Sequence, residues 1–287
     1  MSVRDRVTRA SKSPSPQAKN GNSASPVFAT PVVIVGPMPL ESTTASSSEA
    51  LPNPNAHTLA IDIGGTGIKM IVLDAAATPL NERARTLTPR PATPEAMLDV
   101  IKTMIAAQPA FDRVAVGFPG IVKRGITINA PNLADEAWRN FPLQERIEQI
   151  AGRPVRAMND ADLQGFGVIA GKGVELALTL GTGVGSGLYV DGRLVPNLEL
   201  GHHPWKKDQS YEDRLRDSEL QEIGKKHWSK RVFEMIEQLE PIFNYDTLYL
   251  GGGNTEHIKG DLPANVKLFS NVEGMSGGVR IWATGVV

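Results

Sequence analysis

The stretch "LAIDIGGTGIKMIVLD", residues 59–74, decides the fold that the sequence predicts. Two apolar segments flank a glycine-rich turn, a pattern typical of two strands joined by a tight connection. The pattern returns as "ALTLGTGVGSGLYVD", residues 177–191, so that Ala60 aligns with Ala177 and Asp74 with Asp191 without a gap. Each copy opens a segment of strands and helices, so the duplication predicts two homologous α/β domains that face one cleft.

The rest of the chain supports this class of fold. Apolar runs that end in turns predict strands over residues 58–65, 68–74, 113–120, 154–160, 176–183, 186–192, 247–253 and 266–272. Helical patterns lie between them, over residues 93–108, 142–152, 160–173 and 219–243. Strands that alternate with helices in this way indicate an α/β architecture.

The composition excludes several classes of protein. The chain has 287 residues and a formal net charge of −1, so no global field would attract nucleic acid or a membrane surface. It has no apolar run of about 18 residues or more, the length needed to span a bilayer. Cysteine is absent, which excludes disulfides and thiolate metal sites and fits a reducing compartment. We therefore expect a cytoplasmic protein without nucleic-acid or membrane partners.

The first 56 residues differ in kind from the rest. Segments such as "SKSPSPQAKNGNSASP" and "ESTTASSSEALPNPN" are rich in Ser, Pro and Ala and show no helical or alternating period. Such segments cannot bury enough apolar surface to offset the loss of chain entropy, so residues 1–56 are predicted to be a disordered tail. Their basic start slightly resembles a transit peptide, but a solvated basic tail is the favoured interpretation.

The glycine turns have a chemistry of their own. Glycine allows the backbone to approach a ligand closely, and successive turn N–H groups form a concave site for an anion such as phosphate. The first turn contains Gly64 and Gly65, and the second contains Gly181 and Gly183. Two such turns from facing domains could grip a polyphosphate tail between them. Asp62, beside the first turn, is well placed to hold Mg²⁺, directly or through water.

These turns resemble the phosphate and adenosine motifs of the sugar kinase, actin and heat-shock ATPase superfamily. A third turn, "YLGGGNT" at residues 249–255, follows another apolar strand and belongs to the same resemblance. The resemblance implies phosphate binding by Asp62, Gly64, Gly65, Thr66, Lys69, Gly181, Thr182 and Gly183. It implies nucleotide binding by Gly251, Gly252, Gly253 and Asn254.

Further motifs resemble the ROK sugar kinases within that superfamily. They are "GFPGIV", "NAPNL", "MNDADLQG" and "LELGHHPW". In the C-terminal half, "YEDRL", "GKKHWSKRV" and "FNYDTLYLGGGN" are similar to the polyphosphate glucokinase subgroup of the family. The resemblance implies an α/β, two-domain ribonuclease-H-like fold with an interdomain cleft. The expected small domain comprises residues 57–158 plus 273–287, and the expected large domain comprises residues 159–272.

The same resemblance implies a role for individual residues around a sugar. Asp160 matches the catalytic base, and phosphorylation of a hydroxyl needs a group that accepts its proton. Asn, Asp, Glu and His side chains can satisfy the many hydroxyls of a hexose with directed hydrogen bonds. The sugar-binding set implied here is Gly120, Asn132, Asn159, Asp160, Glu199, His202 and Glu212.

The chain departs from the wider family in one respect. Most ROK proteins carry a cysteine-rich zinc segment after the "GH" motif, and this chain has no cysteine, so zinc is not expected. The polyphosphate glucokinases likewise look zinc-free. The implied cofactor is Mg²⁺ alone.

The phosphoryl donor depends on a basic region. Lysines and arginines crowd residues 206–231, where they could bind an anion longer than ATP. Acids are interleaved, so a solvated charged face is the plain alternative. The region comprises Lys206, Lys207, Arg214, Arg216, Lys225, Lys226, Lys230 and Arg231.

The sequence therefore predicts a kinase that phosphorylates glucose at its 6-hydroxyl with inorganic polyphosphate, ATP or both. Mannose is a second candidate acceptor, and the resemblance implies a homodimer. An ATP-only ROK hexokinase and a non-catalytic ROK-type sugar-sensing protein stay open as alternatives. Repressors of the family carry an N-terminal helix-turn-helix, which the pattern of residues 1–56 does not match.

Overall fold

The computed structural model describes residues 55–283. Apart from Asn55 and Ala56, the predicted tail lies outside the described residues. No helix in the described part of the chain is long and apolar enough to cross a membrane.

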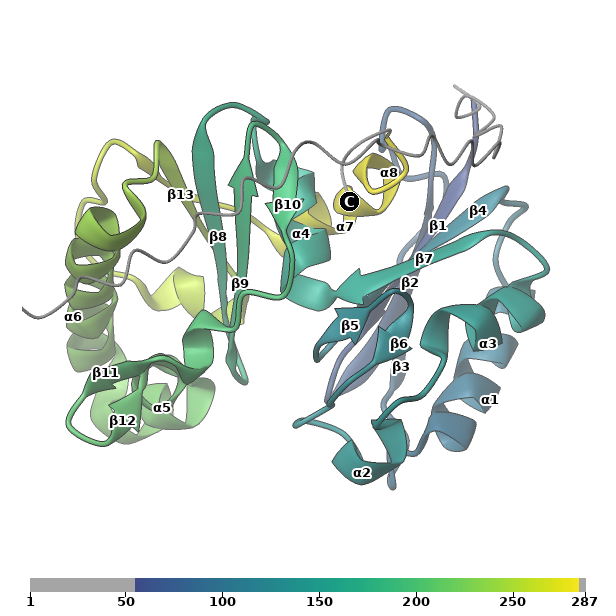
Figure 1. The fold of residues 1–287 in the computed structure, drawn as a ribbon, viewed down its shortest axis with the longest axis horizontal. Coiled ribbons are helices and arrows are strands. Elements are labelled where there is room, and N and C mark those ends of the chain that lie inside the picture. The colour runs from purple at the N-terminus through teal and green to yellow at the C-terminus, as the bar shows by residue number, and fades with distance from the viewer. Residues whose placement is uncertain (1–54, 284–287) are drawn as a thin grey trace, which may run out of the picture. The chain divides into compact units, whose positions relative to one another are not determined.

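The first sheet has five strands in the order β3-β2-β1-β4-β7. β1, β2 and β3 form antiparallel pairs, whereas β4 is parallel to β1 and β7 is parallel to β4. The strands are β1 (Thr58–Ile63), β2 (Gly67–Leu73), β3 (Ala84–Leu87), β4 (Arg113–Phe118) and β7 (Val155–Asn159). The helices α1 (Pro94–Ala106) and α3 (Leu143–Ala151) pack their apolar faces on this sheet (Figure 1).

The second sheet repeats the first. Its order is β10-β9-β8-β13-β14, and its strand directions follow the same scheme of an antiparallel meander followed by two parallel strands. The strands are β8 (Val174–Leu180), β9 (Val184–Val190), β10 (Arg193–Val195), β13 (Thr247–Gly251) and β14 (Val266–Leu268). The duplication predicted from the two glycine turns is therefore confirmed by the sheet topology.

The long helix α6 (Asp217–Phe243) packs on the second sheet through residues such as Trp228, Val232 and Met235. Gly224 interrupts its helical backbone with φ 79° and ψ 157°, a conformation that favours glycine. The kink separates a short first part of α6 from the main part.

The helix α4 (Asp160–Val168) contacts β4 and β7 of the first sheet and β8 and β9 of the second. It also contacts α7 (Asn271–Met275) and α8 (Gly277–Arg280). A Cβ atom on Gly277 would lie 1.9 Å from the carbonyl oxygen of Leu163, so glycine is needed for this close approach. This packing fixes the N-terminus of α4, where Asn159 and Asp160 lie.

Short elements complete the described chain, and most of them were not predicted. They are β5 (Val122–Lys123), β6 (Ile126–Thr127), α2 (Asp135–Trp138), η1 (Leu200–His202), β11 (Pro204–Lys206), β12 (Gln209–Ser210), α5 (Tyr211–Leu215) and η2 (Gly253–His257).

The segment after α7 lies against the first sheet, since α8 contacts β1 and β4. The guanidinium groups of Arg113 and Arg156 lie 5.4 Å and 4.8 Å from the ring centroid of Trp282. Arg156 also donates a hydrogen bond to the carbonyl oxygen of Ile281. The predicted domain boundaries, including the assignment of residues 273–287, stay predictions.

Trp138 is a sharp test of the core beneath the first sheet. Its side chain is fully buried, its Nε1–H donates to the Ala92 carbonyl oxygen at 2.8 Å, and its ring centroid lies 4.9 Å from that of Phe118. We expect Trp138→Ala to lower the free energy of unfolding by about 3–5 kcal/mol in urea titrations. The exposed Leu87 provides the control, because Leu87→Ala should cost less than about 0.5 kcal/mol. Equal losses in the two variants would contradict this description of the core.

Candidate functional site

A cavity of about 240 Å³ gathers most of the residues predicted to bind sugar and phosphate. The β1–β2 turn, the β8–β9 turn, the N-terminus of α4 and the segment around η1 all contribute to its lining. The predicted residues that line it are Asp62, Gly64, Gly65, Thr66, Lys69, Gly120, Asn132, Asn159, Asp160, Gly181, Thr182, Gly183, Glu199, His202, Glu212 and Gly252.

Each glycine turn is closed by a backbone hydrogen bond from its first glycine, although the first turn is one residue longer than the second. The Gly64 N–H donates to the Gly67 carbonyl oxygen at 3.0 Å, and the Gly181 N–H donates to the Gly183 carbonyl oxygen at 3.0 Å. Glu212 lies against the second turn, where its Oε2 accepts the Val184 N–H at 3.1 Å. The turns therefore occupy corresponding places in the two sheets, and both line one cavity.

Asp62 and Lys69 are paired across the first hairpin. They are register partners on β1 and β2, and Lys69 Nζ lies 2.7 Å from Asp62 Oδ2. In the described part of the chain, no group of three or more His, Cys, Asp or Glu side chains is arranged to hold a metal ion. Protein ligands for a cation at Asp62 are therefore few.

Asp160 is the first residue of α4, and Asn159 caps that helix. Asn159 Oδ1 accepts the N–H groups of Ala161 and Asp162 at 2.8 and 3.1 Å, and its Nδ2 donates to the Gly120 carbonyl oxygen at 3.2 Å. Such a cap orients the helix terminus and satisfies backbone donors. The Asp160 carboxyl group is thereby aimed into the cavity between the two glycine turns.

Burial of the Asp160 carboxyl group disfavours its charged form and so increases its affinity for a proton. The pKa of Asp160 is raised to about 8, mainly by burial and in part by the nearby carboxyl groups of Asp62 and Glu199. Burial is also the main cause that raises the pKa of Glu199, while His202, whose Nε2 lies 3.8 Å from Glu199 Oε2, opposes that shift. A carboxyl group with a pKa near neutrality can accept and release a proton during turnover.

Gly120 and Gly252 need to be glycine for steric reasons. A Cβ atom on Gly120 would lie 2.2 Å from the carbonyl oxygen of Asn129, and one on Gly252 would lie 2.3 Å from that of Leu180. Gly252 also has φ 89°, which favours glycine. Both residues therefore bring their backbone close to neighbouring segments at the cavity wall.

Some residues of the third glycine turn line a cavity, and others are packed against neighbouring segments. A second cavity, of about 440 Å³, is lined by Gly252 and Gly253 and shares Gly252 with the first. Gly251 instead packs under Phe269, and the buried Asn254 donates its Nδ2 to the Gly181 carbonyl oxygen at 3.4 Å. Gly251, Gly253 and Asn254 therefore do not line the first cavity, and their role with a nucleotide stays a prediction.

Sequence reasoning missed several residues of the first cavity. Gln164 lies one turn after Asp160 on α4, so its spacing could have placed it on the same helix face. Thr179 is the second-last residue of β8, two positions before Gly181 in the turn that follows, so the alternation of side chains along a strand could have directed it toward the side of the turn. The full set that sequence analysis did not assign is Pro119, Pro131, Gln164, Thr179, Val184 and Gly185.

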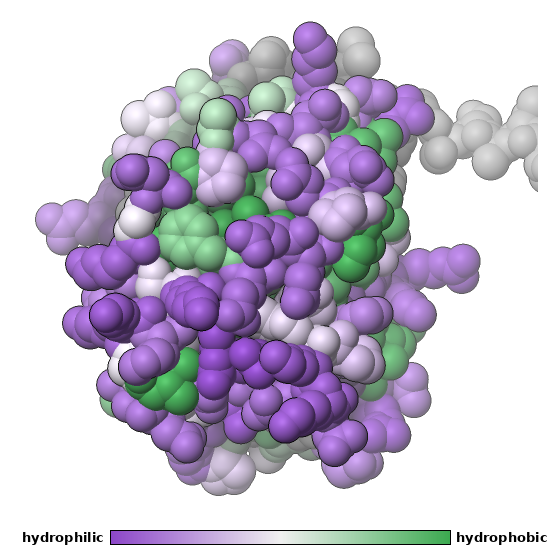
Figure 2. Space-filling view, turned by 90° about the vertical axis from the view of Figure 1, so that its left-hand side faces the viewer, coloured by the Kyte–Doolittle hydropathy of each residue, from purple (hydrophilic) through white to green (hydrophobic). Residues whose placement is uncertain are grey.

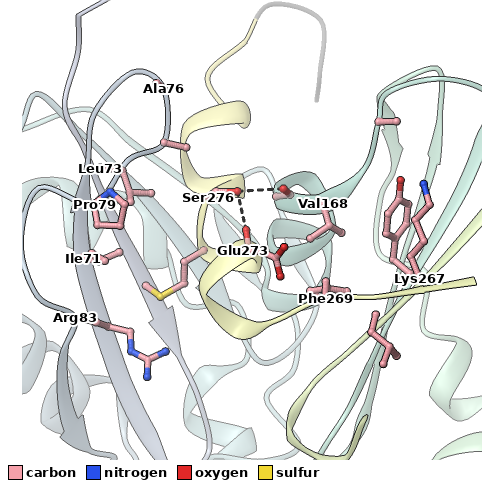
Figure 3. A pocket seen from close by; sticks show the side chains of 16 residues that line it. Ile71, Leu73, Ala76, Pro79, Arg83, Val168, Lys267, Phe269, Glu273 and Ser276 are labelled. Carbon is pink, nitrogen blue, oxygen red and sulfur yellow. Dashed lines mark hydrogen bonds between the residues drawn. The ribbon is translucent and has the colours of Figure 1, made fainter. Parts of the chain in front are cut away.

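A larger cavity, of about 660 Å³, lies elsewhere. Apolar side chains such as Ile71 and Phe269 line it, together with Arg83 and Glu273 (Figure 3). Glu273 is already engaged, because its carboxylate accepts hydrogen bonds from the backbone and hydroxyl of Ser270. Since this cavity lacks the facing glycine turns and a carboxyl group with a raised pKa, we place the chemistry at the Asp160 cavity.

Three of the predicted basic residues are occupied by neighbouring acids. Arg214 lies 3.7 Å from Glu234, and Arg231 pairs with Glu219. Arg214 also lies 4.8 Å from the ring centroid of Trp205. The third, Arg216, lies 4.0 Å from an oxygen of Asp213. These arginines therefore have structural partners in addition to any anion they could meet.

The remaining basic residues are lysines on the surface. Within residues 55–283 they have no ion-pair partner, and all five are exposed: Lys206, Lys207, Lys225, Lys226 and Lys230. α6 connects three of them to the site, because the Asp217 N–H at its start donates to the Gly181 carbonyl oxygen at 2.7 Å. The face that α6 and the β11–β12 hairpin present is largely hydrophilic (Figure 2). Lys225, Lys226 and Lys230 thus lie along the helix that starts at the second glycine turn.

Comparisons with known proteins agree with this geometry. The sequence pattern of the ROK family matches residues 58–211. The chain is 32% identical over 224 residues to a protein named polyphosphate glucokinase from Mycobacterium tuberculosis (strain ATCC 25618 / H37Rv), a match that covers 73% of this chain and 84% of the relative.

Solved structures show the same relationship. The inorganic polyphosphate/ATP-glucomannokinase from Arthrobacter sp. strain KM superimposes with a TM-score of 0.70 and 32% identity, covering 79% of this chain and 98% of that one. A ROK family glucokinase from Streptomyces griseus, solved with glucose and AMPPNP, shares the fold at a TM-score of 0.63 and 22% identity, covering 78% of this chain and 98% of that one. The family pattern spans more than half of the sequence, and the two mixed β-sheets combine with helices into an α/β fold. The chain therefore belongs to the ROK family and has its ribonuclease-H-like sugar kinase fold.

Proposed function

We propose that this protein phosphorylates glucose at its 6-hydroxyl, with inorganic polyphosphate or ATP as the donor and Mg²⁺ as the cofactor. The observation that carries the proposal is that Asp160, two glycine turns from the two sheets and a set of sugar-compatible side chains line one cavity. The names of the relatives, polyphosphate glucokinase and polyphosphate/ATP-glucomannokinase, support both the acceptor and the donors. Mannose is the second acceptor that we propose.

The acceptor side of the cavity suits a hexose. Asn132, Asn159, Glu199 and His202 offer both hydrogen-bond donors and acceptors at the cavity wall, as neighbouring sugar hydroxyls require. The backbone at Gly120 approaches without a side chain in the way. A site of this kind rejects analogues that lack a hydroxyl, because its own polar groups would then lose their partners.

Asp160 is the group that we propose to accept the proton of the attacking hydroxyl. Its raised pKa brings proton affinity close to the working pH, where a general base is most effective. Gly65 and Thr66 of the first turn and Thr182 and Gly183 of the second line the same cavity. Their backbone N–H groups would hold the phosphate oxygens of the donor. The donor and acceptor are thereby aligned for in-line transfer.

The residues at Asp62 fit a magnesium ion only in part. A carboxylate oxygen is a preferred ligand of Mg²⁺, and this ion commonly takes its other ligands from substrate phosphates and water, which suits a site with few protein ligands. When bound, Mg²⁺ would neutralise charge on the transferring phosphoryl group. Lys69, which pairs with Asp62 in this structure, would then be released toward the phosphates.

The raised pKa of Asp160 predicts a pH dependence. The carboxyl group is protonated below about pH 8 in the free protein, and only the deprotonated form can act as a base. We therefore expect kcat/KM for glucose to fall as the pH is lowered from about 8, with the midpoint moved to lower pH by bound Mg²⁺. A profile from about pH 6 to 9 measures this, and a flat profile would contradict the assignment of Asp160 as the base.

The proposal is tested by a donor and acceptor screen. Purified protein, Mg²⁺ and glucose or mannose are incubated with ATP or with polyphosphate of graded length, and the hexose 6-phosphate formed is measured. Turnover with both donors is expected. Turnover with ATP alone would identify an ATP-only hexokinase, and hexose binding without any turnover would identify a non-catalytic sugar sensor.

Two further parts of the proposal rest on the resemblance to the family. They are a homodimeric state and a cytoplasmic location. Light scattering coupled to size-exclusion chromatography tests the first, and a monomer at assay concentration would contradict it.

A further inference from the structure

Asp162 is a buried carboxyl group that the proposed chemistry does not use. Its exposed fraction is 1%, and its Oδ2 accepts the Asn197 N–H at 3.1 Å. Its other oxygen, Oδ1, is buried and has no hydrogen-bond partner in the described part of the chain. Burial of a polar group with an unmet hydrogen bond destabilises a fold. The buried carboxyl group therefore has a cost to the fold, and its hydrogen bond to the Asn197 N–H is the interaction through which it could have a function.

Asn197 connects the second half of the chain to a loop of the first. Its side-chain Oδ1 accepts the Val122 N–H at 3.1 Å. Val122 starts β5, two residues after Gly120 in the cavity wall. Asn197 has φ 57°, and asparagine tolerates this left-handed conformation better than most residues. The backbone of Asn197 thus points its N–H at Asp162 while its side chain reaches Val122.

Hydrogen bonds close this connection into a ring. The Gly120 carbonyl oxygen accepts Asn159 Nδ2, and Asn159 Oδ1 accepts the Asp162 N–H. Asp162 Oδ2 accepts the Asn197 N–H, and Asn197 Oδ1 accepts the Val122 N–H. The covalent chain from Gly120 to Val122 completes the ring. The loop at Gly120, the start of α4 and the segment at Asn197 are therefore held at one fixed spacing.

Glu199 lies within the reach of this ring. It follows Asn197 by two residues, and Ser186 anchors the residues on either side of it, Leu198 and Leu200. The Ser186 hydroxyl donates to the Leu198 carbonyl oxygen, and its oxygen accepts the Leu200 N–H at 3.1 Å. Glu199 is therefore held close to Asn197, so a change in the link from Asn197 to Val122 would change the position of Glu199 relative to Gly120.

We propose that Asp162 and Asn197 are positioning residues that set the spacing between the Gly120 backbone and the Glu199 carboxyl group for a bound hexose. This inference rests on the proposed function. It holds that these two residues determine how tightly the sugar acceptor binds and do not take part in the phosphoryl transfer step. Neither residue lines the cavity, so both act through the groups that they hold.

Two variants break the ring at different points. Asn197→Gly removes the side-chain acceptor of the Val122 N–H and keeps a residue that tolerates φ 57°. Asp162→Ala removes the acceptor of the Asn197 N–H. In each we expect the glucose KM to rise about tenfold, with the ATP KM changed by less than about threefold, because misplacement of binding groups costs acceptor affinity. The glucose KM of the double variant should rise by no more than about the larger of the two single rises, because each single variant already breaks the same ring.

Conservative variants and a matched control separate positioning from general destabilisation. Asn197→Asp and Asp162→Asn each keep an oxygen acceptor and should restore most of the glucose affinity. Glu175 is also a buried carboxylate, and it accepts the N–H groups of Ala170, Gly171 and Lys172 away from the cavity. Glu175→Gln should lower the melting temperature and leave the glucose KM unchanged.

The outcomes distinguish this inference from the proposed function. If the wild-type protein phosphorylates glucose and both Asn197→Gly and Asp162→Ala keep its glucose KM, the positioning role is wrong and the kinase assignment stands. A wild-type protein that phosphorylates no hexose overturns both. If Asp162→Ala does not fold, Asn197→Gly decides the question, because its glucose KM either rises or does not.

Discussion

Asp160→Asn is expected to lower kcat by about 10²–10⁴-fold, the usual contribution of a positioned general base. The amide keeps the size and most of the hydrogen bonds of the carboxyl group at the start of α4, but it cannot take up the proton of the 6-hydroxyl. Glucose affinity, measured by calorimetry, should stay within about threefold of wild type. A variant that keeps more than about a third of the wild-type kcat would mean that another group is the base.

The same substitution should stabilise the fold. Burial raises the pKa of Asp160 from 3.8 to about 8, so ionisation of this group is disfavoured in the folded state. That cost is absent below about pH 4 and grows as the pH rises toward 8. At pH 7 without Mg²⁺, Asp160→Asn should therefore raise the free energy of unfolding by a few kcal/mol. Its melting temperature should then exceed that of wild type, and the difference should vanish in acid. An unchanged or lower melting temperature at pH 7 would contradict the burial of this charge.

The triple variant Lys225→Gln, Lys226→Gln, Lys230→Gln is expected to raise the KM for long polyphosphate by about 10-fold or more and the KM for ATP by less than about threefold. These lysines follow the helix that starts at the second glycine turn, so a polyanion that leaves the cavity along α6 would meet them. A long chain engages more cations than ATP does, and its affinity should fall more steeply with salt, by analogy with other polyanions. Initial rates with polyphosphate of graded length measure the effect.

A control with the same loss of charge tests the location. Lys102, Lys172 and Arg193 are exposed cations on α1, on the loop before β8 and on β10. Their combined replacement by Gln changes the net charge equally but should leave the preference between donors unchanged. Equal losses of polyphosphate affinity in the two triple variants would show that net charge matters and that no track follows α6.

Sequence analysis predicted four of the five strands of each sheet and much of the cavity, because those features depend on short segments, but it missed the edge strands β3 and β10. The turns at Gly64 and Gly181 could be predicted from their glycines alone, and the sequence repeat indicated that the two halves of the chain share one fold. Asp160 could be found because it ends a strand and starts a helix in a recognisable motif. Parallel strands then carry such residues to the same edge of a sheet.

Other features depend on contacts that spacing does not reveal. Arg231 was predicted as part of an anion track, but the kink at Gly224 lets it meet Glu219 from the earlier part of α6. Asn254 follows a glycine turn like a ligand-binding residue, yet it is buried against Gly181. The hydrogen bond from Asn197 to Asp162 joins residues 35 positions apart, and no sequence motif predicts that these two residues are in contact.

The central claim is that the Asp160 cavity transfers a phosphoryl group to the 6-hydroxyl of glucose, and ³¹P NMR of one reaction tests it most directly. Wild-type protein, Mg²⁺, glucose and either polyphosphate or ATP should give the resonance of glucose 6-phosphate, with loss of terminal donor phosphate. Under the same conditions Asp160→Asn, folded and able to bind glucose, should give almost none. Phosphate released to water without a sugar ester, a sugar phosphorylated at another hydroxyl, or equal product from the two proteins would contradict the account.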